Sequence, residues 1–230
     1  MLLIMQFDKR NYRVSIPLLN KFLNNVIYLN RLKIFKIFIK NIKYNKSTKI
    51  IDIGTTPIIA KHENILFNLY KFKNNLTGFS NQDCNNLKKK FKKSKFIIGD
   101  ARKTNLKDNS FDIVFSSATL EHVGNYNNQK KMIKELLRIA KKNVFITTPN
   151  RNFLFDFHTK LPVIHLLPKN IHRKILKLLG FKFFSLEDNL NLLNTMELKK
   201  ILKELKINNY KILYNKFLLL NSNILLLIKK

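Results

Sequence analysis

The amino-acid sequence predicts an α/β fold, in which a mostly parallel sheet carries helices on both faces and closes with an antiparallel hairpin. Apolar segments of strand length, several of them rich in β-branched side chains, recur at residues 49–54, 76–80, 95–100, 111–118 and 143–149. Segments with the spacing of amphipathic helices lie between them, an alternation that is typical of a parallel sheet. Near the end of the chain, apolar residues 211–220 and 224–230 flank Asn221-Ser222-Asn223, which predicts a hairpin that turns at these three residues.

Helical patterns fill the intervals between the predicted strands. We expect helices at about residues 61–73, 83–93 and 127–141. In the last of these helices the residues expected to face the core are Met132, Ile133, Leu136, Leu137 and Ile139.

A further helix is predicted over residues 25–44, before the first strand. Its two faces carry Lys33, Lys36, Lys40 and Lys43 on one side and Phe35, Phe38, Ile39 and Ile42 on the other. Residues 1–48 thus form a basic helical N-terminal extension, which we expect to cap the core or cover the functional site, although such a helix could also lie on an anionic membrane. Residues 49–230 form the main domain, with an insertion at about 150–194.

Composition restricts the class of protein and its partners. A chain of 230 residues, 45% apolar, is long enough for one domain with a substantial core. Its net charge of +30 could attract nucleic acid, but it comes from 37 lysines and only 7 arginines, and arginine is the residue on which phosphate and base recognition depends more heavily. Because lysine, asparagine and isoleucine are abundant together, we attribute the charge to a background bias and do not expect nucleic acid as a partner.

Cysteine content and hydropathy indicate a cellular location. Cys84 is the single cysteine, so an intramolecular disulfide is excluded and a thiolate zinc site is not expected. No stretch reaches the roughly 18 apolar residues that a membrane span requires. We therefore expect a cytoplasmic protein that could contact the inner face of an anionic membrane.

Small and acidic residues follow three of the predicted strands, at the edge where open α/β sheets bind their ligands. Asp52-Ile-Gly-Thr-Thr-Pro57 follows the first strand, and Gly54 lets the chain turn sharply there. Gly99-Asp100-Ala101 follows the third strand, and Ser116-Ser117-Ala118 ends the fourth, just before Glu121-His122. No G-x-G-x-x-G follows the first strand, which disfavours a nicotinamide-dependent enzyme.

With these motifs and the segment Thr147-Thr-Pro-Asn-Arg151, the chain resembles the class I S-adenosylmethionine-dependent methyltransferases, in the branch called methyltransferase type 11. The resemblance runs from about Ile50 to the C-terminus. It implies a Rossmann-like seven-stranded sheet and S-adenosylmethionine as cofactor. The family more often has Asp-x-Gly-x-Gly-x-Gly after the first strand, and this chain keeps only the first glycine.

The resemblance also implies which residues hold the cofactor. Asp52 would accept from its amino group, and Gly54 and Thr55 would lie close to it. Asp83 would accept from the ribose hydroxyls, although Asn81 or Gln82 could serve instead and Asp83 could be a helix cap. Asp100 would accept from the adenine amino group while the Ala101 amide meets the ring, and small Ser116 and Ser117 would leave room for the methionine part.

The acceptor is expected to meet residues of the insertion. The segment 147–180 resembles a subset of these methyltransferases, and on this reading Asn150, Arg151, Asp156, His158 and His165 face the acceptor pocket. If the acceptor is a hydroxyl, a base must take its proton, and histidine suits this role near neutral pH. His158 is the first candidate base, followed by His122 and His165. Since no carboxylate can be placed beside these histidines from sequence, we expect no metal site.

These observations predict a methyltransferase that acts on a small-molecule or lipid- or sugar-linked acceptor, at oxygen. Two alternatives stay open. A nucleic-acid methyltransferase would present a continuous basic face leading to the cofactor. A non-catalytic binding module that retains the fold would fail to bind the cofactor, which the incomplete glycine motif allows.

Overall fold

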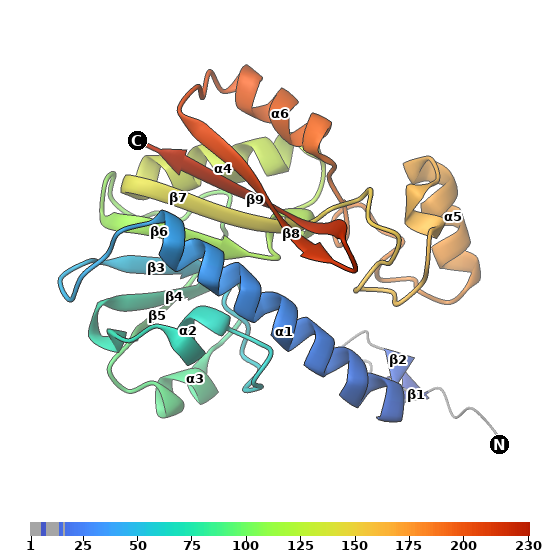
Figure 1. The fold of residues 1–230 in the computed structure, drawn as a ribbon, viewed down its shortest axis with the longest axis horizontal. Helices are drawn as coiled ribbons and strands as arrows, with labels where there is room; N and C mark the ends of the chain where they lie inside the picture. The colour runs from blue at the N-terminus through green and yellow to red at the C-terminus, as the bar shows by residue number, and fades with distance from the viewer. Residues whose placement is uncertain (1–5, 8–13, 16) are drawn as a thin grey trace.

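A seven-stranded sheet forms the centre of the molecule (Figure 1). The structure is a computed structural model that describes residues 6–7, 14–15 and 17–230, with side chains from residue 23 onward, so the predicted extension is described only in part. The strands are β3 (Ile50–Ile53), β4 (Leu76–Ser80), β5 (Lys95–Ile98), β6 (Phe111–Ser117), β7 (Ala140–Pro149), β8 (Tyr210–Phe217) and β9 (Leu220–Lys229). Their order is β5-β4-β3-β6-β7-β9-β8, and the first five are parallel while β9 runs antiparallel to both neighbours. This confirms the predicted fold class.

Helices cover both faces of the sheet (Figure 1). On one face, α4 (Tyr126–Ile139) and α6 (Thr195–Glu204) bury residues such as Leu136 and Ile201 against β3, β6, β7 and β9. On the other face, α1 (Pro17–Asn41) and α2 (Ile65–Leu69) form a second apolar layer. The remaining elements are α3 (Asn85–Lys90), α5 (Lys169–Leu178), and the short pair β1 (Gln6–Phe7) and β2 (Val14–Ser15).

Helix α1 is an integral part of the core. Phe38 is fully buried and meets the rings of Phe115 and Phe145 edge to face, at centroid distances of 5.2 and 5.3 Å. The lysines predicted on the outer face are exposed as expected. Ile39 was expected among the inward residues but is 39% exposed, because the buried stripe runs through Ile34, Phe35, Phe38 and Ile42 and leaves Ile39 at its edge. No helix of the described chain is both long enough and apolar enough to cross a bilayer.

Several predicted helices are shorter than expected, and two of the described helices, α5 and α6, were not predicted. The helix expected over 61–73 is reduced to α2, since Asn64 before it adopts φ 45° and a 3₁₀ turn at Lys73–Asn75 leads into β4. The helix expected over 83–93 covers only α3. Helix α6 was missed, although its capping box was readable: Asn194 accepts from the Glu197 amide, and the Glu197 side chain accepts from the Asn194 amide.

The turn of the C-terminal hairpin was predicted in the wrong place. The chain turns at Leu218 and Leu219, which adopt φ of 48° and 66°, and residues 221–223 lie within β9. The asparagine and serine side chains are buried because they join a polar cluster with α1 and β8. In that cluster Asn30 donates to Asn223 over 2.7 Å, and Asn215 donates to the Asn30 carbonyl over 3.2 Å.

Candidate active site

A cavity of about 1060 Å³ opens at the carboxyl ends of β3, β4, β5 and β6. This is the switch point of the sheet, because the chain leaves β3 toward β4 and β5 and then returns to form β6 on the other side of β3. The volume is at the upper end of ordinary ligand pockets, so a cofactor and a second molecule fit together. Residues that line the cavity include Arg31, Asp52, Gly54, Thr55, Thr56, Glu63, Asn81, Gln82, Ile98, Asp100, Ala101, Arg102, Ser117, Ala118, Thr119, His122, His158, Asp188 and Asn189.

The loop after β3 is shaped by an asparagine side chain. The Asn64 carboxamide accepts from the Thr56 amide over 2.9 Å and donates to the carbonyls of Thr56 and Ile58 over 2.9 and 3.1 Å. Thr55 lies between this loop and β4, where its amide donates to the Phe79 carbonyl over 3.0 Å. These bonds hold a tight loop at positions where the family more often has glycine.

A glycine is required at position 54 both by the backbone conformation there and by the closeness of the Thr119 side chain. Gly54 has a φ of +97°, and a Cβ atom built on it would lie 1.8 Å from Oγ1 of Thr119. The Thr119 hydroxyl itself donates to the Ile53 carbonyl over 3.2 Å. The close approach that fixes this glycine is therefore made by the segment after β6.

Gly54→Ala is expected to lower the free energy of unfolding by about 2–4 kcal/mol, because it combines a strained φ with a steric overlap. Urea denaturation followed by circular dichroism measures the change. By itself, Thr119→Ala should lower the free energy of unfolding by less than about 1 kcal/mol. In the double variant it should recover part of the stability that Gly54→Ala loses. A Gly54→Ala protein as stable as the wild type would contradict this packing.

Asp52 presents a buried carboxyl group to the cavity. The residue is only 5% exposed, and burial raises its pKa to about 7, although the positive charge of Arg31 acts to lower the pKa. Arg31 reaches the site from α1 and is shared with Glu63, whose carboxylate it contacts at 2.8 Å. A bound ammonium group would supply the additional positive charge that this carboxyl lacks.

The predicted adenine and ribose residues differ in how they are placed. Asp100 lines the cavity with a side chain that is 47% exposed, and it forms a bidentate ion pair with Arg102, with Nη2 to Oδ2 at 2.6 Å. The hydrogen bond from Arg102 lowers the pKa of Asp100. Ala101 also lines the cavity, beside Ile98, whose side chain is 59% exposed and offers an apolar surface. The carboxylate predicted to meet adenine is thus half-exposed and already paired.

Asp83 does not line the cavity in the described structure. It is exposed and accepts from the amide of Asn85 over 3.2 Å at the start of α3, which fits the helix-cap alternative. Asn81 and Gln82 do line the cavity. The position of Asp83 therefore does not support the ribose role predicted for it, whereas the two alternatives, Asn81 and Gln82, are placed where a ribose could meet them.

Of the three small residues at the end of β6, Ser116 to Ala118, only Ser117 and Ala118 line the cavity. Ser117 bonds to the hydroxyl of Thr147 over 3.0 Å, and Ala118 adopts φ 54°. Ser116 is fully buried within the sheet and donates to the Ile53 carbonyl over 2.9 Å. Its position does not support the predicted contact with the cofactor, because strand alternation turns its side chain away from the cavity.

Three residues of the insertion stabilise the loop and lie away from the cavity. Asn150 donates to the Asn221 carbonyl over 2.9 Å, and Arg151 donates to the carbonyls of His165 and Leu167 over 3.2 and 2.7 Å. The imidazole of His165 is 1% exposed, with Nε2 at 2.6 Å from the Phe153 carbonyl. The predictions that Asn150, Arg151 and His165 face the acceptor pocket are therefore not supported by their positions.

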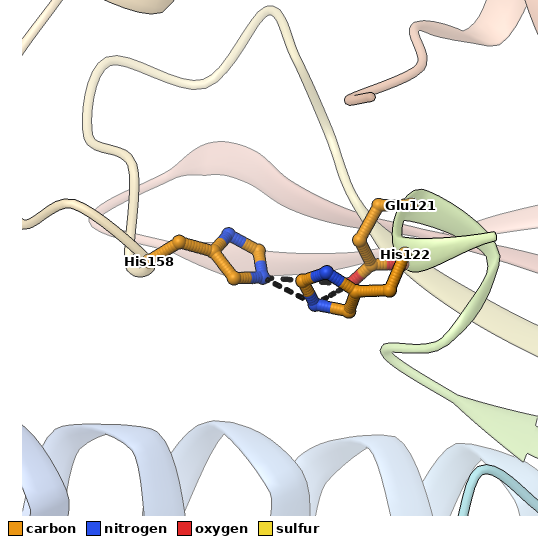
Figure 2. Close-up of side chains that lie close together, drawn as sticks. All are labelled: Glu121, His122 and His158. Atoms are coloured by element: carbon orange, nitrogen blue, oxygen red, sulfur yellow. Dashed lines mark hydrogen bonds and ion pairs between the residues drawn. The ribbon is translucent and has the colours of Figure 1, made fainter. Parts of the chain in front are cut away.

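The side chains of His158 and His122 point toward each other, as Figure 2 shows, and both residues line the cavity. The two Nε2 atoms are 3.1 Å apart, although the residues are separated by 36 positions in the chain. His158 Nδ1 lies 2.9 Å from Oδ1 of Asp156, and His122 Nδ1 lies 2.6 Å from the carbonyl of Asn189. Burial, and then the charge of His158, lower the pKa of His122.

Asp156 lies behind His158 and does not line the cavity. It is 3% exposed and accepts from the backbone amide and Nδ1 of His158, each over 2.9 Å, and from Oγ1 of Thr159 over 2.7 Å. Burial opposes its ionisation, but the hydrogen bonds and charge of His158 prevail and lower the pKa of Asp156. Asp156 therefore orients His158, and a direct contact with the acceptor is not supported.

Glu121 is a buried carboxylate that the sequence analysis did not assign to the site. It is 0% exposed, and its Oε2 accepts from Oγ1 of Thr148 over 2.9 Å. Its Oε1 is 3.7 Å from Nε2 of His158 and 4.0 Å from Nε2 of His122. The Glu-His dipeptide was a visible signal, but only the fold shows that both of its side chains reach His158.

Comparisons with known proteins agree with this architecture. The methyltransferase type 11 model, described as a methyltransferase domain, matches residues 69–147, which include β4 to β6 and most of β7. No curated protein matches the chain.

Similar solved structures include a SAM-dependent methyltransferase from Aquifex aeolicus, with a TM-score of 0.55, 14% identity and coverage of 84% of this chain and 88% of that one. Another, from Thermotoga maritima and described as a possible histamine N-methyltransferase, has a TM-score of 0.57, 16% identity and coverage of 92% and 93%. A third, from Methanosarcina mazei, has a TM-score of 0.54, 15% identity and coverage of 81% and 94%.

The cofactor of such proteins suits the residues present. The buried Asp52 carboxyl suits an ammonium group, the amides of Asn81 and Gln82 suit a ribose, and Ile98 offers an apolar surface to a base. Strand order and the position of the cavity are those of the S-adenosylmethionine-dependent methyltransferase fold that these structures share, and residues 69–147 match the methyltransferase domain model.

Proposed function

We propose that the protein transfers a methyl group from S-adenosylmethionine to a hydroxyl oxygen of a small-molecule or lipid- or sugar-linked acceptor. The observation that carries this proposal is the convergence of His158 and His122, with Nε2 atoms 3.1 Å apart, on the wall of the cavity that also contains Asp52. A hydroxyl is a weak nucleophile that needs help to lose its proton, and imidazole nitrogen atoms supply that help.

Cofactor and acceptor would be held by different parts of the wall. Asp52 binds the amino group, Asn81 or Gln82 the ribose, and Asp100 with Ala101 the adenine. When bound, S-adenosylmethionine would supply an electrophilic methyl group to the acceptor oxygen, and the electron pair of the broken methyl–sulfur bond would stay on sulfur. The hydroxyl proton moves to Nε2 of His158, whose ring is oriented by the 2.9 Å bond from its Nδ1 to Asp156.

The charge of the cavity favours a small acceptor over nucleic acid. The described lining contains four carboxylates, Asp52, Glu63, Asp100 and Asp188, and two guanidinium groups, Arg31 and Arg102. Each guanidinium is paired with one of these carboxylates, and no lysine belongs to the described lining. A wall of this kind repels a phosphate backbone, which needs free cations.

A lipid-linked acceptor is favoured by the insertion that carries His158. This segment exposes large apolar side chains, among them Leu154 and Val163 at 50% each and Leu166 at 41%. Exposed apolar groups clustered along one segment are typical of surfaces that meet an apolar partner. These exposed side chains favour a class of acceptor, and a screen identifies the individual molecule.

His158→Gln tests the proposal, because it removes a proton acceptor while keeping a polar side chain. Binding of S-adenosylhomocysteine, measured by calorimetry, should stay within about twofold, and the turnover of labelled methyl groups into hydroxyl acceptors should fall about a hundredfold. A panel of phenols, sugars and glycolipid extracts provides the acceptors. His172→Gln is the matched control, since His172 lies outside the cavity in the described structure.

Two outcomes would contradict the proposal. If His158→Gln left turnover unchanged, the imidazole pair would have no part in the reaction. If the folded wild-type protein bound neither S-adenosylmethionine nor S-adenosylhomocysteine, the chain would be a non-catalytic module that retains the fold.

A further inference from the structure

Three side-chain atoms converge on a single point at the cavity wall (Figure 2). They are Oε1 of Glu121 and the Nε2 atoms of His122 and His158, separated by 3.1, 3.7 and 4.0 Å. A point equidistant from all three lies about 2.1 Å from each, within the range of roughly 2.0–2.2 Å that zinc takes with imidazole nitrogen and carboxylate oxygen. The atoms are therefore spaced as the ligands of one metal ion are spaced.

The hydrogen bonds made by the other side of each imidazole indicate that the three converging atoms of Glu121, His122 and His158 can all act as acceptors toward one another. The Asn189 carbonyl can only accept, so Nδ1 of His122 carries the proton of the 2.6 Å bond. Ionised Asp156 can likewise only accept, so Nδ1 of His158 donates across 2.9 Å. When both imidazoles are neutral, as metal binding requires, each then presents a lone pair at Nε2. Oε1 of Glu121 is fully buried and accepts no hydrogen bond from the described chain.

Such a cluster is unfavourable unless a cation lies within it. Two lone pairs 3.1 Å apart beside a buried carboxylate oxygen repel one another, and a polar atom buried without a partner costs about 1–3 kcal/mol. A proton can bridge only two of the three atoms at once. A metal ion satisfies all three together.

The geometry points to a binding site for a divalent transition-metal ion, held by Glu121, His122 and His158, with its open positions toward the cavity. Two imidazoles and one carboxylate suit zinc and its first-row neighbours, and three protein ligands leave positions free, as in catalytic sites. His122 and His158 both line the cavity, so those positions are accessible from it. The expectation of no metal site, made from sequence, is thereby replaced.

The surroundings of the three ligands match those of metal centres. Metal-bound histidine usually donates its other nitrogen proton to a carboxylate or a carbonyl, as His158 and His122 do here with Asp156 and Asn189. Glu121 is also fixed, through the bond from Thr148 to its second oxygen. Each ligand is therefore oriented before any ion arrives.

This inference deepens the proposed function and, for the role of the ion, rests on it. With the ion bound, Nε2 of His158 would be a ligand and would no longer take the acceptor proton. The ion would instead bind the hydroxyl oxygen of the acceptor and lower the pKa of that hydroxyl, so that its proton leaves to solvent. Binding of the ion itself requires neither cofactor nor acceptor.

Cobalt titration of the chelator-stripped protein tests the site, because Co²⁺ absorbs visible light with an intensity that depends on its ligands. We expect saturation at one ion per chain. Glu121→Gln and His122→Gln should each weaken Co²⁺ binding tenfold or more, which is the usual order of loss when a metal site is disturbed. His172→Gln, away from the cavity, should bind Co²⁺ as the wild type does.

The result that would overturn the site is a lack of saturable Co²⁺ binding, or binding that both ligand variants retain. Circular dichroism shows whether each variant is folded, and two separate ligand variants protect the test against the failure of one. S-adenosylhomocysteine binding, measured on the same samples, separates the two proposals: a protein that binds the nucleoside but no Co²⁺ refutes the metal site alone.

Discussion

Asp52→Asn is expected to weaken the binding of S-adenosylmethionine about a hundredfold or more. The Asp52 carboxyl is buried at the start of the loop after β3, where a ligand ammonium would form an ion pair in surroundings from which water is largely excluded. Removing one partner of such a pair costs about 2–5 kcal/mol, because the other charge is left without compensation. Calorimetric titration measures the change directly. Asp83→Asn is the matched control, since that carboxylate lies outside the described cavity.

The same residue makes cofactor affinity depend on pH. In the free protein the pKa of Asp52 is raised to about 7, and a bound ammonium would lower it, so below pH 7 binding must first remove a proton. Affinity for S-adenosylhomocysteine should therefore rise about tenfold from about pH 5.5 to pH 7. The Asp52→Asn protein should show a flat profile over that range. A flat profile in the wild type would exclude the ion pair.

Asp156→Ala is expected to lower the free energy of unfolding by about 3–5 kcal/mol, and turnover with it. The variant leaves a buried amide, a hydroxyl and an imidazole proton without their acceptor, and removal of one partner from a buried charged network has this order of cost. Urea denaturation measures the stability.

Controls distinguish this positioning role from a general loss of stability. Asp108→Ala removes a carboxylate that is 68% exposed and paired with Arg138, and should cost less than about 1 kcal/mol. Asp156→Asn keeps one acceptor oxygen and should recover part of the stability. If Asp156→Ala were as stable as Asp108→Ala, the hydrogen bonds around His158 would not stabilise the fold.

The strands and the first site residue were predictable because local patterns determine them. Short apolar runs marked β3, β4 and β6, and Asp52-Ile-Gly54 marked the loop that follows β3. His158 and His122 could be singled out by residue type and by resemblance. Their approach to within 3.1 Å could not, since it depends on how the insertion folds back over the end of β6.

Residues that depend on tertiary contacts were missed or misplaced. Arg31 enters the cavity only because α1 packs on the sheet, and Glu121 is directed inward by Thr148 of the adjacent strand β7. The Asn-Ser-Asn segment has ordinary turn chemistry, but burial against Asn30 and Asn215 outweighs that preference and places it inside β9. Asn150, Arg151 and His165 form backbone contacts of a loop, a role that residue type alone does not reveal.

The asparagine that closes the loop after β3 has a thermodynamic consequence for cofactor binding. A loop with three glycines explores many backbone conformations when empty, and ordering it on binding costs conformational entropy. In this chain Asn64 makes three hydrogen bonds to Thr56 and Ile58 before any ligand arrives, and Thr55 and Thr56 restrict the backbone further. The loop is preorganised, so a smaller part of the binding free energy is lost to ordering it, and the missing glycines need not weaken the affinity.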